Sequence, residues 1–263
     1  MAGLTVTADD FGLCPEVNDA ICLLHDRGIV QRTTLMVNTD YFDASVAALR
    51  SRPALEVGIH LNLTDGRPVL VARQVPTLVN RHGAFRGGRH YSVAALILCG
   101  RMTCREIRSE WEAQIARAKD AGVDVQQLSA HGHLHLLPPL HGIVADLLEQ
   151  FAIPHLRIVS PSASVRGVVL GLASHGLVSV LRRRRLSVAC AGHTLGLHHS
   201  GALDERRLVN ALGTKREGAV ELIVHPSLGG NEYHRRWRYA GDVETRALLT
   251  DRVARLLQNG RAR

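Results

Sequence analysis

Apolar residues along the chain follow two patterns that alternate. Short runs rich in β-branched residues predict strands, and longer segments with apolar residues every three or four positions predict helices. The predicted strands cover residues 3–9, 32–38, 55–63, 125–133, 155–161 and 219–227. The predicted helices cover residues 14–28, 41–52, 104–121, 138–151, 203–214 and 242–258. A long irregular connection is expected over residues 64–92.

Strands that alternate with helices at this spacing predict a parallel sheet with right-handed crossovers. For a chain of 263 residues, we expect an α/β fold of the (β/α) barrel type, either closed or an incomplete TIM-type barrel. A doubly wound open sheet is the alternative, although its G-x-G-x-x-G fingerprint does not follow the first strand. No internal repeat or low-complexity linker divides the chain, so we expect a single domain covering residues 1–263.

The formal net charge of +8 is compatible with phosphates, nucleic acid or anionic membranes as partners. No zinc finger, helix-turn-helix or RNP-type motif is present, so we expect no nucleic-acid partner. The five cysteines are odd in number and form no C-x-x-C pair, which favours a reducing cytoplasm. No signal-peptide pattern opens the chain, and no apolar run reaches the length of a membrane span. The sequence is compatible with a homo-oligomer and does not define one.

An apolar segment with a basic end stands apart from the rest of the chain. Residues 165–188 read as an apolar helix that ends in four arginines, Arg182 to Arg185. One interpretation is a covering helix whose basic end suits the helix dipole. The other is a surface that meets an anionic membrane, at the inner face of the cytoplasmic membrane, or a lipid-linked substrate.

Polar side chains stand at the ends of four predicted strands. Asp9 and Asp10 end the first strand, and His60 lies near the end of the third. His131 opens an H-x-H-x-H run at the end of a later strand, and His225 precedes a proline at the end of the last. Because the carboxyl ends of parallel strands share one face, we expect these residues to converge.

The H-x-H-x-H run favours a metal site. In an extended strand, residues two apart face the same side, so His131, His133 and His135 would point one way. Asp10, His60 and His131 would supply one carboxylate and two imidazoles, a set suited to Zn²⁺ or a similar divalent ion. Each signal also has an ordinary explanation, because aspartate pairs are typical of turns and strand histidines are commonly hydrogen-bonded core residues.

Four motifs in order give the chain a family resemblance. The stretches TADDFGLCPEVNDAI, VGIHLNLTDGRPV, SAHGHLHLLP and ELIVHPS resemble the successive motifs of the YdjC-like carbohydrate deacetylases. The stretches VPTLVNRHGAFR and GLHHSGALDERRL are most similar to the branch associated with hopanoid biosynthesis; chitooligosaccharide deacetylases form another branch. The resemblance implies a barrel-like fold, a divalent metal (Mg²⁺ or Zn²⁺) and removal of acetyl groups from N-acetylated sugars.

The resemblance also implies roles for individual residues. Asp10, His60 and His131 correspond to the metal ligands, Asp9 to the catalytic base and His225 to a candidate general acid. His133, His135 and Arg157 would line the site or support the ligands from outside. Two departures from the family pattern concern substrate contacts: Ser129 stands where Asp or Asn is common, and the run around Arg157 lacks the usual acid.

The expected activity is therefore metal-dependent N-deacetylation of an amino sugar, either lipid-linked or a chitooligosaccharide. A metal-dependent phosphoesterase is a second hypothesis, because Asp, His and Arg also serve phosphates; a two-metal site would need more carboxylates than the strand ends offer. A non-catalytic metal-binding protein is the third, and it would bind the ion without hydrolysing an amide or ester.

Overall fold

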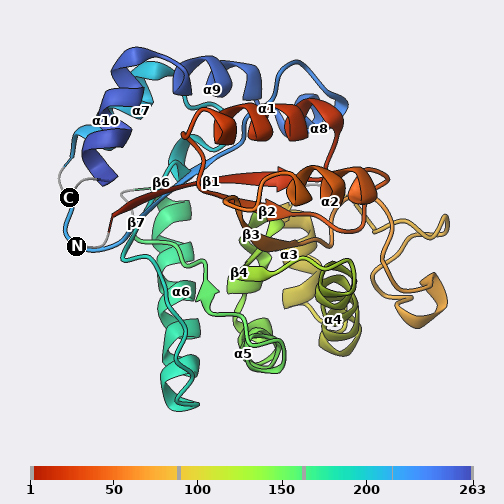
Figure 1. Ribbon diagram of the computed structural model, residues 1–263. Coiled ribbons are helices and arrows are strands. Elements are labelled where there is room, and N and C mark those ends of the chain that lie inside the picture. The colour runs from red at the N-terminus through yellow and green to blue at the C-terminus, as the bar shows by residue number, and fades with distance from the viewer. Residues whose placement is uncertain (1–2, 88–89, 162–163, 215, 262–263) are drawn as a thin grey trace. The chain divides into compact units, whose positions relative to one another are not determined.

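The computed structural model describes residues 3–87, 90–161, 164–214 and 216–261 (Figure 1). Its strands are β1 (Leu4–Phe11), β2 (Arg32–Leu35), β3 (Glu56–Leu61), β4 (Val125–Ala130), β5 (His155–Leu156), β6 (His193–Leu195) and β7 (Val220–Val224). Its α-helices are α1 (Pro15–Asp26), α2 (Phe42–Arg50), α3 (His90–Leu98), α4 (Cys104–Asp120), α5 (His141–Gln150), α6 (Val165–Arg183), α7 (Glu205–Gly213), α8 (Glu232–Trp237), α9 (Gly241–Leu248) and α10 (Asp251–Arg261). Short 3₁₀ segments are η1 (Ala72–Gln74), η2 (His131–Leu136), η3 (Pro138–Leu140) and η4 (Leu197–His199).

The strand order is that of an incomplete (β/α) barrel. The seven strands follow the order β5-β4-β3-β2-β1-β7-β6. Consecutive strands are neighbours, and β7 pairs in parallel with β1, as in a barrel. In the part of the chain that the structure describes, the order is interrupted between β5 and β6, which are its two edges. This order confirms the predicted fold class and differs from a doubly wound sheet, where the order reverses at the first strand.

The chain groups into two compact units. One contains Met1–Leu35, Asp43–Glu56 and Cys190–Arg263, and the other contains Met36–Phe42 and Val57–Ala189. We call them unit 1 and unit 2. The single domain expected for residues 1–263 stays a prediction.

Unit 1 is built around β1, which is buried along nearly its whole length. Helix α1 starts at Pro15, where a proline is tolerated because the first helical N–H groups have no partner within the helix. Its apolar residues Val17, Ile21 and Leu24 recur at helical spacing and are buried. Helices α9 and α1 pack together, and α10 packs on β1 and α7. The two strands beside β1, β2 and β7, both run parallel to it.

Unit 2 contains β3, β4 and β5 with helices α3 to α6. Helix α4 begins where the Thr103 side chain accepts a hydrogen bond from the Glu106 backbone N–H, a typical helix cap. Its buried face includes Ile107, Trp111 and Ile115 and packs toward β4 and α5. The β3 and β4 strands pair with His60 opposite Ser129.

Several predicted elements have different bounds in the structure. The strand expected over residues 125–133 ends at Ala130, and the strand expected over 155–161 keeps only two residues. The helix expected over 242–258 is two helices, because α9 ends at Leu248 before α10 begins. Helix α3, helix α8 and strand β6 were not predicted; the three residues of β6 are too few for a periodic pattern.

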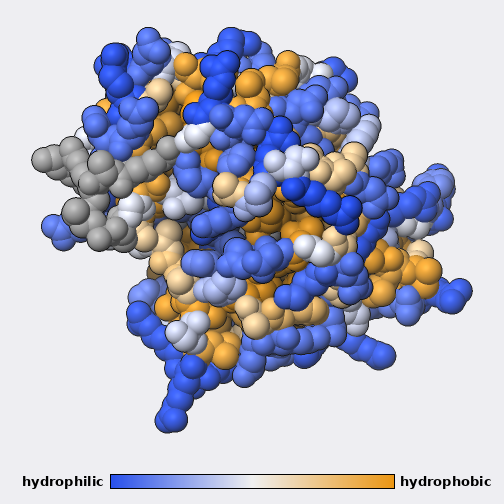
Figure 2. Space-filling view, in the orientation of Figure 1, coloured by the Kyte–Doolittle hydropathy of each residue, from blue (hydrophilic) through white to orange (hydrophobic). Residues whose placement is uncertain are grey.

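Helix α6 has an exposed apolar face. Its buried face consists largely of small residues and leucines: Gly167, Gly171, Ser174, Leu177 and Leu181. The opposite face exposes four apolar residues at helical spacing, Val165, Val168, Val169 and Leu172, with Val165 84% and Leu172 69% exposed. Figure 2 shows hydrophobic surface over α6 and hydrophilic side chains at its lower end. Among the described helices, α6 alone has the length and hydropathy of a membrane span, a test that core helices of soluble proteins also pass.

Candidate metal centre

A β-bulge in β1 contains the two consecutive aspartates, Asp9 and Asp10. Ala8 pairs with Thr33 and Phe11 with Leu35, so the register with β2 shifts between them. Within this bulge Asp10 has a φ of 70°, a left-handed conformation that is uncommon for a residue other than glycine. Bulges of this kind redirect side chains and are frequent beside active sites. The bulge therefore lies at the two adjacent aspartates that the sequence analysis singled out, and it is the local structure that sets their directions.

Asp9 lies in a buried polar group within unit 1. Its Oδ1 accepts a hydrogen bond from the Thr34 hydroxyl at 2.8 Å. Its Oδ2 lies 3.9 Å from Nε2 of His225, too far for a hydrogen bond but close enough for a charge interaction. Both side chains are nearly excluded from solvent. Asp9 therefore lies beside the histidine that the motifs paired with it.

The hydrogen bond at Nδ1 of His60 indicates the tautomer of its ring. Its Nδ1 lies 2.9 Å from the Ser129 hydroxyl oxygen, and that hydroxyl donates to the carbonyl of Ile59 at 3.1 Å. Since the Ser129 proton points to the carbonyl, the serine oxygen accepts from the imidazole, and this assigns the ring proton to Nδ1. Nε2 of His60 then presents its lone pair, which is the form that binds a metal.

The H-x-H-x-H run does not continue the strand. Gly132 and His133 both have positive φ, 64° and 61°, inside the 3₁₀ segment that follows β4. At Gly132 a Cβ would lie 2.3 Å from Cβ of His90, so glycine is required there. The expectation that all three histidines alternate along one strand is therefore wrong.

The turn gives the later histidines separate surroundings. Nε2 of His135 lies 2.9 Å from the Arg157 carbonyl oxygen, a hydrogen bond that fastens the 3₁₀ segment to the residue after β5. Burial lowers the pKa of His133 well below its ordinary value, which makes this imidazole neutral. Arg157 is itself fully buried. The roles predicted for His133, His135 and Arg157 in binding substrate or supporting the ligands stay predictions.

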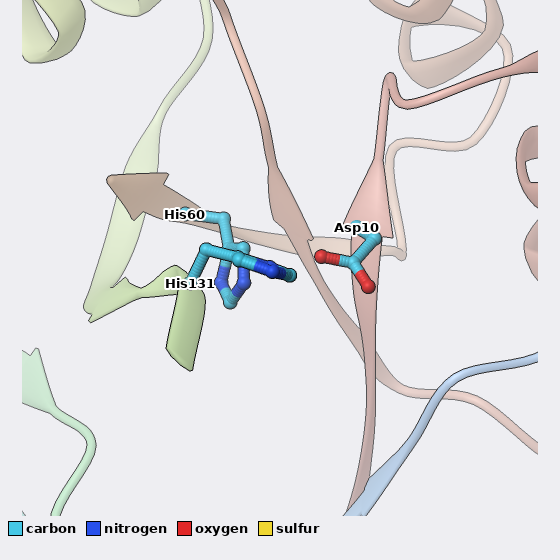
Figure 3. Close-up of side chains that lie close together, drawn as sticks. All are labelled: Asp10, His60 and His131. Atoms are coloured by element: carbon cyan, nitrogen blue, oxygen red, sulfur yellow. The ribbon is translucent and has the colours of Figure 1, made fainter. Parts of the chain in front are cut away.

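Asp10, His60 and His131 lie close together (Figure 3). One ligand atom from each residue lies within 4.8 Å of the other two, and all three side chains are buried. The two imidazole rings meet edge to face, with centroids 5.6 Å apart. One carboxylate and two imidazoles suit a divalent ion such as Zn²⁺, and three protein ligands leave positions for water and substrate. The residues therefore fit the metal that the motifs predicted.

Glu244 is a buried carboxyl group that the sequence analysis missed. Its Oε2 accepts from the backbone N–H of His225 at 2.6 Å, and its Oε1 accepts from the N–H of Leu203 at 3.0 Å. Burial raises the pKa of Glu244 to about 7. An acidic residue on the apolar face of the predicted C-terminal helix is the signal that could have identified it. Glu244 fixes the backbone that carries His225.

The topology and this cluster define a class of protein: an incomplete (β/α) barrel with a candidate divalent-metal centre at the carboxyl ends of its strands. The chain belongs to the YdjC-like protein family, whose model matches residues 3–259. That match confirms the family that the motifs indicated.

Individual relatives carry a shared name. A carbohydrate deacetylase of Brevibacillus brevis is 38% identical over 151 residues, which are 57% of each chain. One of Thermoanaerobacter pseudethanolicus is 26% identical over 256 residues, 96% of this chain and 92% of the relative. The chain spans about three fifths of the length of the curated relatives that it matches at 34–38% identity. A solved structure of an Enterococcus faecalis protein named for cellobiose-phosphate cleavage has the same fold, with a TM-score of 0.77, 24% identity and coverage of 98% and 94%.

Proposed function

We propose that this protein is a metal-dependent N-deacetylase that removes the acetyl group from an N-acetylated amino sugar. The observation that carries the proposal is the buried set of Asp10, His60 and His131, with ligand atoms within 4.8 Å of one another. The family and the name of its relatives, carbohydrate deacetylase, support it. The reacting bond is an amide, a weak electrophile with a poor leaving group.

Each side chain of the site has a distinct task in this proposal. Asp10, His60 and His131 hold the ion, Mg²⁺ or Zn²⁺. A bound divalent ion lowers the pKa of a water molecule and polarises the acetyl carbonyl. Asp9, held by the Thr34 hydroxyl, takes a proton from the attacking water. His225, whose backbone is fixed by Glu244, gives a proton to the departing amine.

The carboxylate beside His225 supports that last task. Asp9 Oδ2 is 3.9 Å from His225 Nε2, and a carboxylate at that distance attracts the protonated imidazole. At the end of the turnover Asp9 holds the proton taken from water and His225 lacks the one given to the amine, so proton exchange with solvent would return both groups to their starting states. The pair can therefore act as base and acid in one turnover.

The sugar is proposed to be lipid-linked, such as an N-acetylglucosaminyl hopanoid, with a chitooligosaccharide as the second candidate. Four exposed apolar residues on α6 and the arginines at its end, Arg182 to Arg185, support a lipid-linked substrate. Apolar side chains insert at the lipid boundary while arginines attract anionic headgroups. All five cysteines are free, which agrees with a cytoplasmic protein that meets the inner face of the membrane.

Acetate release tests the proposal directly. Metal-free protein is given Mg²⁺ or Zn²⁺ and either N-acetylglucosamine oligomers or an N-acetylglucosaminyl lipid. We expect acetate only when metal is restored, and more from the lipid. Asp10→Ala should lose metal binding and acetate release together, whereas Asp9→Asn should keep the metal and lose the activity. Asp19→Asn, an exposed aspartate in α1, is the matched control.

The other two hypotheses predict different results. A phosphoesterase would release phosphate from phosphorylated sugars and leave the acetyl group in place. A non-catalytic protein would bind the ion at Asp10, His60 and His131 and release neither product. Full activity of Asp9→Asn would overturn the assignment of the base, and more acetate from the oligomers than from the lipid would overturn the lipid-linked substrate.

A further inference from the structure

Aromatic residues are concentrated in one segment of unit 1. The chain has two tryptophans and four tyrosines. Tyr233, Trp237 and Tyr239 lie within seven residues, on α8 and directly after it. The other tryptophan, Trp111, is fully buried in α4. A chain so poor in aromatic side chains therefore places half of its tyrosines and tryptophans here.

These rings reach the proposed general acid. The Tyr239 ring centroid lies 4.9 Å from that of His225, at an interplanar angle of 66°. Trp237 contacts Tyr239 in turn, with centroids 5.7 Å apart at 65°. His225 also lies beside Asp9. The aromatic rings thus continue outward from the pair that would handle protons.

The backbone holds the aromatic rings in fixed positions. Arg238 ends α8 with a φ of 62°, and the Tyr239 N–H donates to the His234 carbonyl at 2.7 Å, which closes the helix end. The ring of Tyr239 packs against bare backbone at Gly201, where a Cβ would lie 2.2 Å from the ring. Arg238 is a non-glycine residue in the left-handed conformation, and such residues concentrate at ligand sites, where the surrounding structure enforces them.

The aromatic rings are only partly covered. Tyr233, Trp237 and Tyr239 are half-buried, unlike the fully buried Trp111. His234 lies beneath them, only 2% exposed, with its ring centroid 5.6 Å from that of Tyr239. Neither ring nitrogen of His234 has a hydrogen-bond partner among the described residues. A buried polar group of this kind points to a water molecule or a ligand hydroxyl that completes its bonding.

We propose that Trp237 and Tyr239 form a carbohydrate subsite that stacks against the pyranose ring bearing the acetylated nitrogen. This inference rests on the proposed function and deepens it. An aromatic face carries partial negative charge, and the C–H groups on one face of a pyranose carry partial positive charge. Aromatic rings beside His225 would hold the sugar with its nitrogen next to the group that protonates it. The ligand class is a hexopyranose with an N-acetyl group.

Tryptophan fluorescence tests the subsite without requiring turnover. Trp237 is half-buried and Trp111 is fully buried, so a bound sugar should change only the emission of Trp237. We expect a saturable emission change when the disaccharide of N-acetylglucosamine is added to the intact protein. Trp237→Phe removes the reporter, and the emission of its remaining tryptophan, Trp111, should stay constant when the sugar is added. Glucose without an N-acetyl group is the ligand control.

Kinetics give the second readout. Trp237→Ala should raise KM for the N-acetylated sugar about fivefold with kcat within twofold, and Trp237→Phe should restore most of the affinity, because stacking adds about 1 kcal/mol. Tyr41→Ala removes an exposed tyrosine elsewhere and should leave KM unchanged. Circular dichroism checks that each variant is folded.

The two readouts separate the subsite from the activity. A saturable Trp237 signal with no acetate release from wild type supports the subsite and overturns the deacetylase. Acetate release with no Trp237 signal and an unchanged KM in Trp237→Ala overturns the subsite and keeps the deacetylase. If wild type gives neither sugar binding nor acetate, both are overturned.

Discussion

Removing the Ser129 hydroxyl tests whether the candidate metal centre depends on its supporting hydrogen bonds. In Ser129→Ala, Nδ1–H of His60 loses the acceptor 2.9 Å away, and the Ile59 carbonyl loses its donor. The imidazole can then rotate, and its proton can move to Nε2, the nitrogen that would bind the ion. Metal binding should weaken while the three proposed ligands remain.

The expected size follows from the chemistry of this hydrogen bond. Supporting partners of metal-bound histidines typically change metal affinity by about 10- to 100-fold. Ser129 offers a neutral hydroxyl, and a neutral hydrogen bond is worth about 0.5–1.5 kcal/mol, which corresponds to about 2- to 13-fold. We therefore expect a loss near the low end, about tenfold in Kd. Ser129→Thr, which keeps a hydroxyl, should recover most of it.

Competition with a chromophoric chelator measures Kd for Zn²⁺. Ser174→Ala is the matched control, because Ser174 is also a buried serine of unit 2 and accepts from the Val159 N–H at 2.8 Å, away from the ligands. A Kd for Ser129→Ala within twofold of wild type would refute the reasoning. So would an equal loss in Ser174→Ala, since the effect would then report general destabilisation.

Two further predictions concern stability. Gly196→Ala places a Cβ 2.1 Å from the Ile223 carbonyl oxygen at a φ of 89°, whereas Gly28→Ala has a φ of 70° and open space. In urea titrations we expect Gly196→Ala to lose about 3 kcal/mol of unfolding free energy and Gly28→Ala about 1 kcal/mol. Equal losses would contradict the steric argument. Because burial raises the pKa of Glu244 from 4.5 to about 7, the folded protein retains a proton that the unfolded chain has released between those values. Stability of the metal-free protein should therefore fall as pH rises from about 5 to 7, by at most about 3 kcal/mol, and this fall should be absent in Glu244→Gln; parallel thermal-unfolding profiles would rule it out.

Elements with local signals were predictable from the sequence. Helix α1 starts at Pro15, and α4 lies between the Thr103 cap and the turn at Gly122. The bounds failed where tertiary contacts decide the outcome. Apolar periodicity runs through the junction of α9 and α10, so the pattern alone predicts one continuous helix. Strand β5 is short because only two residues pair with β4, which depends on a neighbour far away in sequence.

The candidate ligands were predictable, but the surroundings of most were not. Asp10, His60 and His131 each end or follow a strand, so the parallel topology alone brings them toward one edge. His133 and His135 were misplaced because the glycine between His131 and His133 turns the chain, a conformation that strand periodicity does not register. Glu244 and the aromatic rings on α8 and directly after it depend on long-range packing, and no motif marks them.

The bulge in β1 lets two adjacent aspartates change independently during evolution. Asp9 contacts Thr34 and His225, whereas Asp10 lies beside the candidate ligands His60 and His131, so a substitution at one leaves the environment of the other in place. In the proposed enzyme, ion preference and proton affinity can then be adjusted by separate mutations. A deletion of one residue within this segment would remove the bulge and shift the register in which the two side chains are presented. The length of the segment therefore matters to the site as much as its composition does.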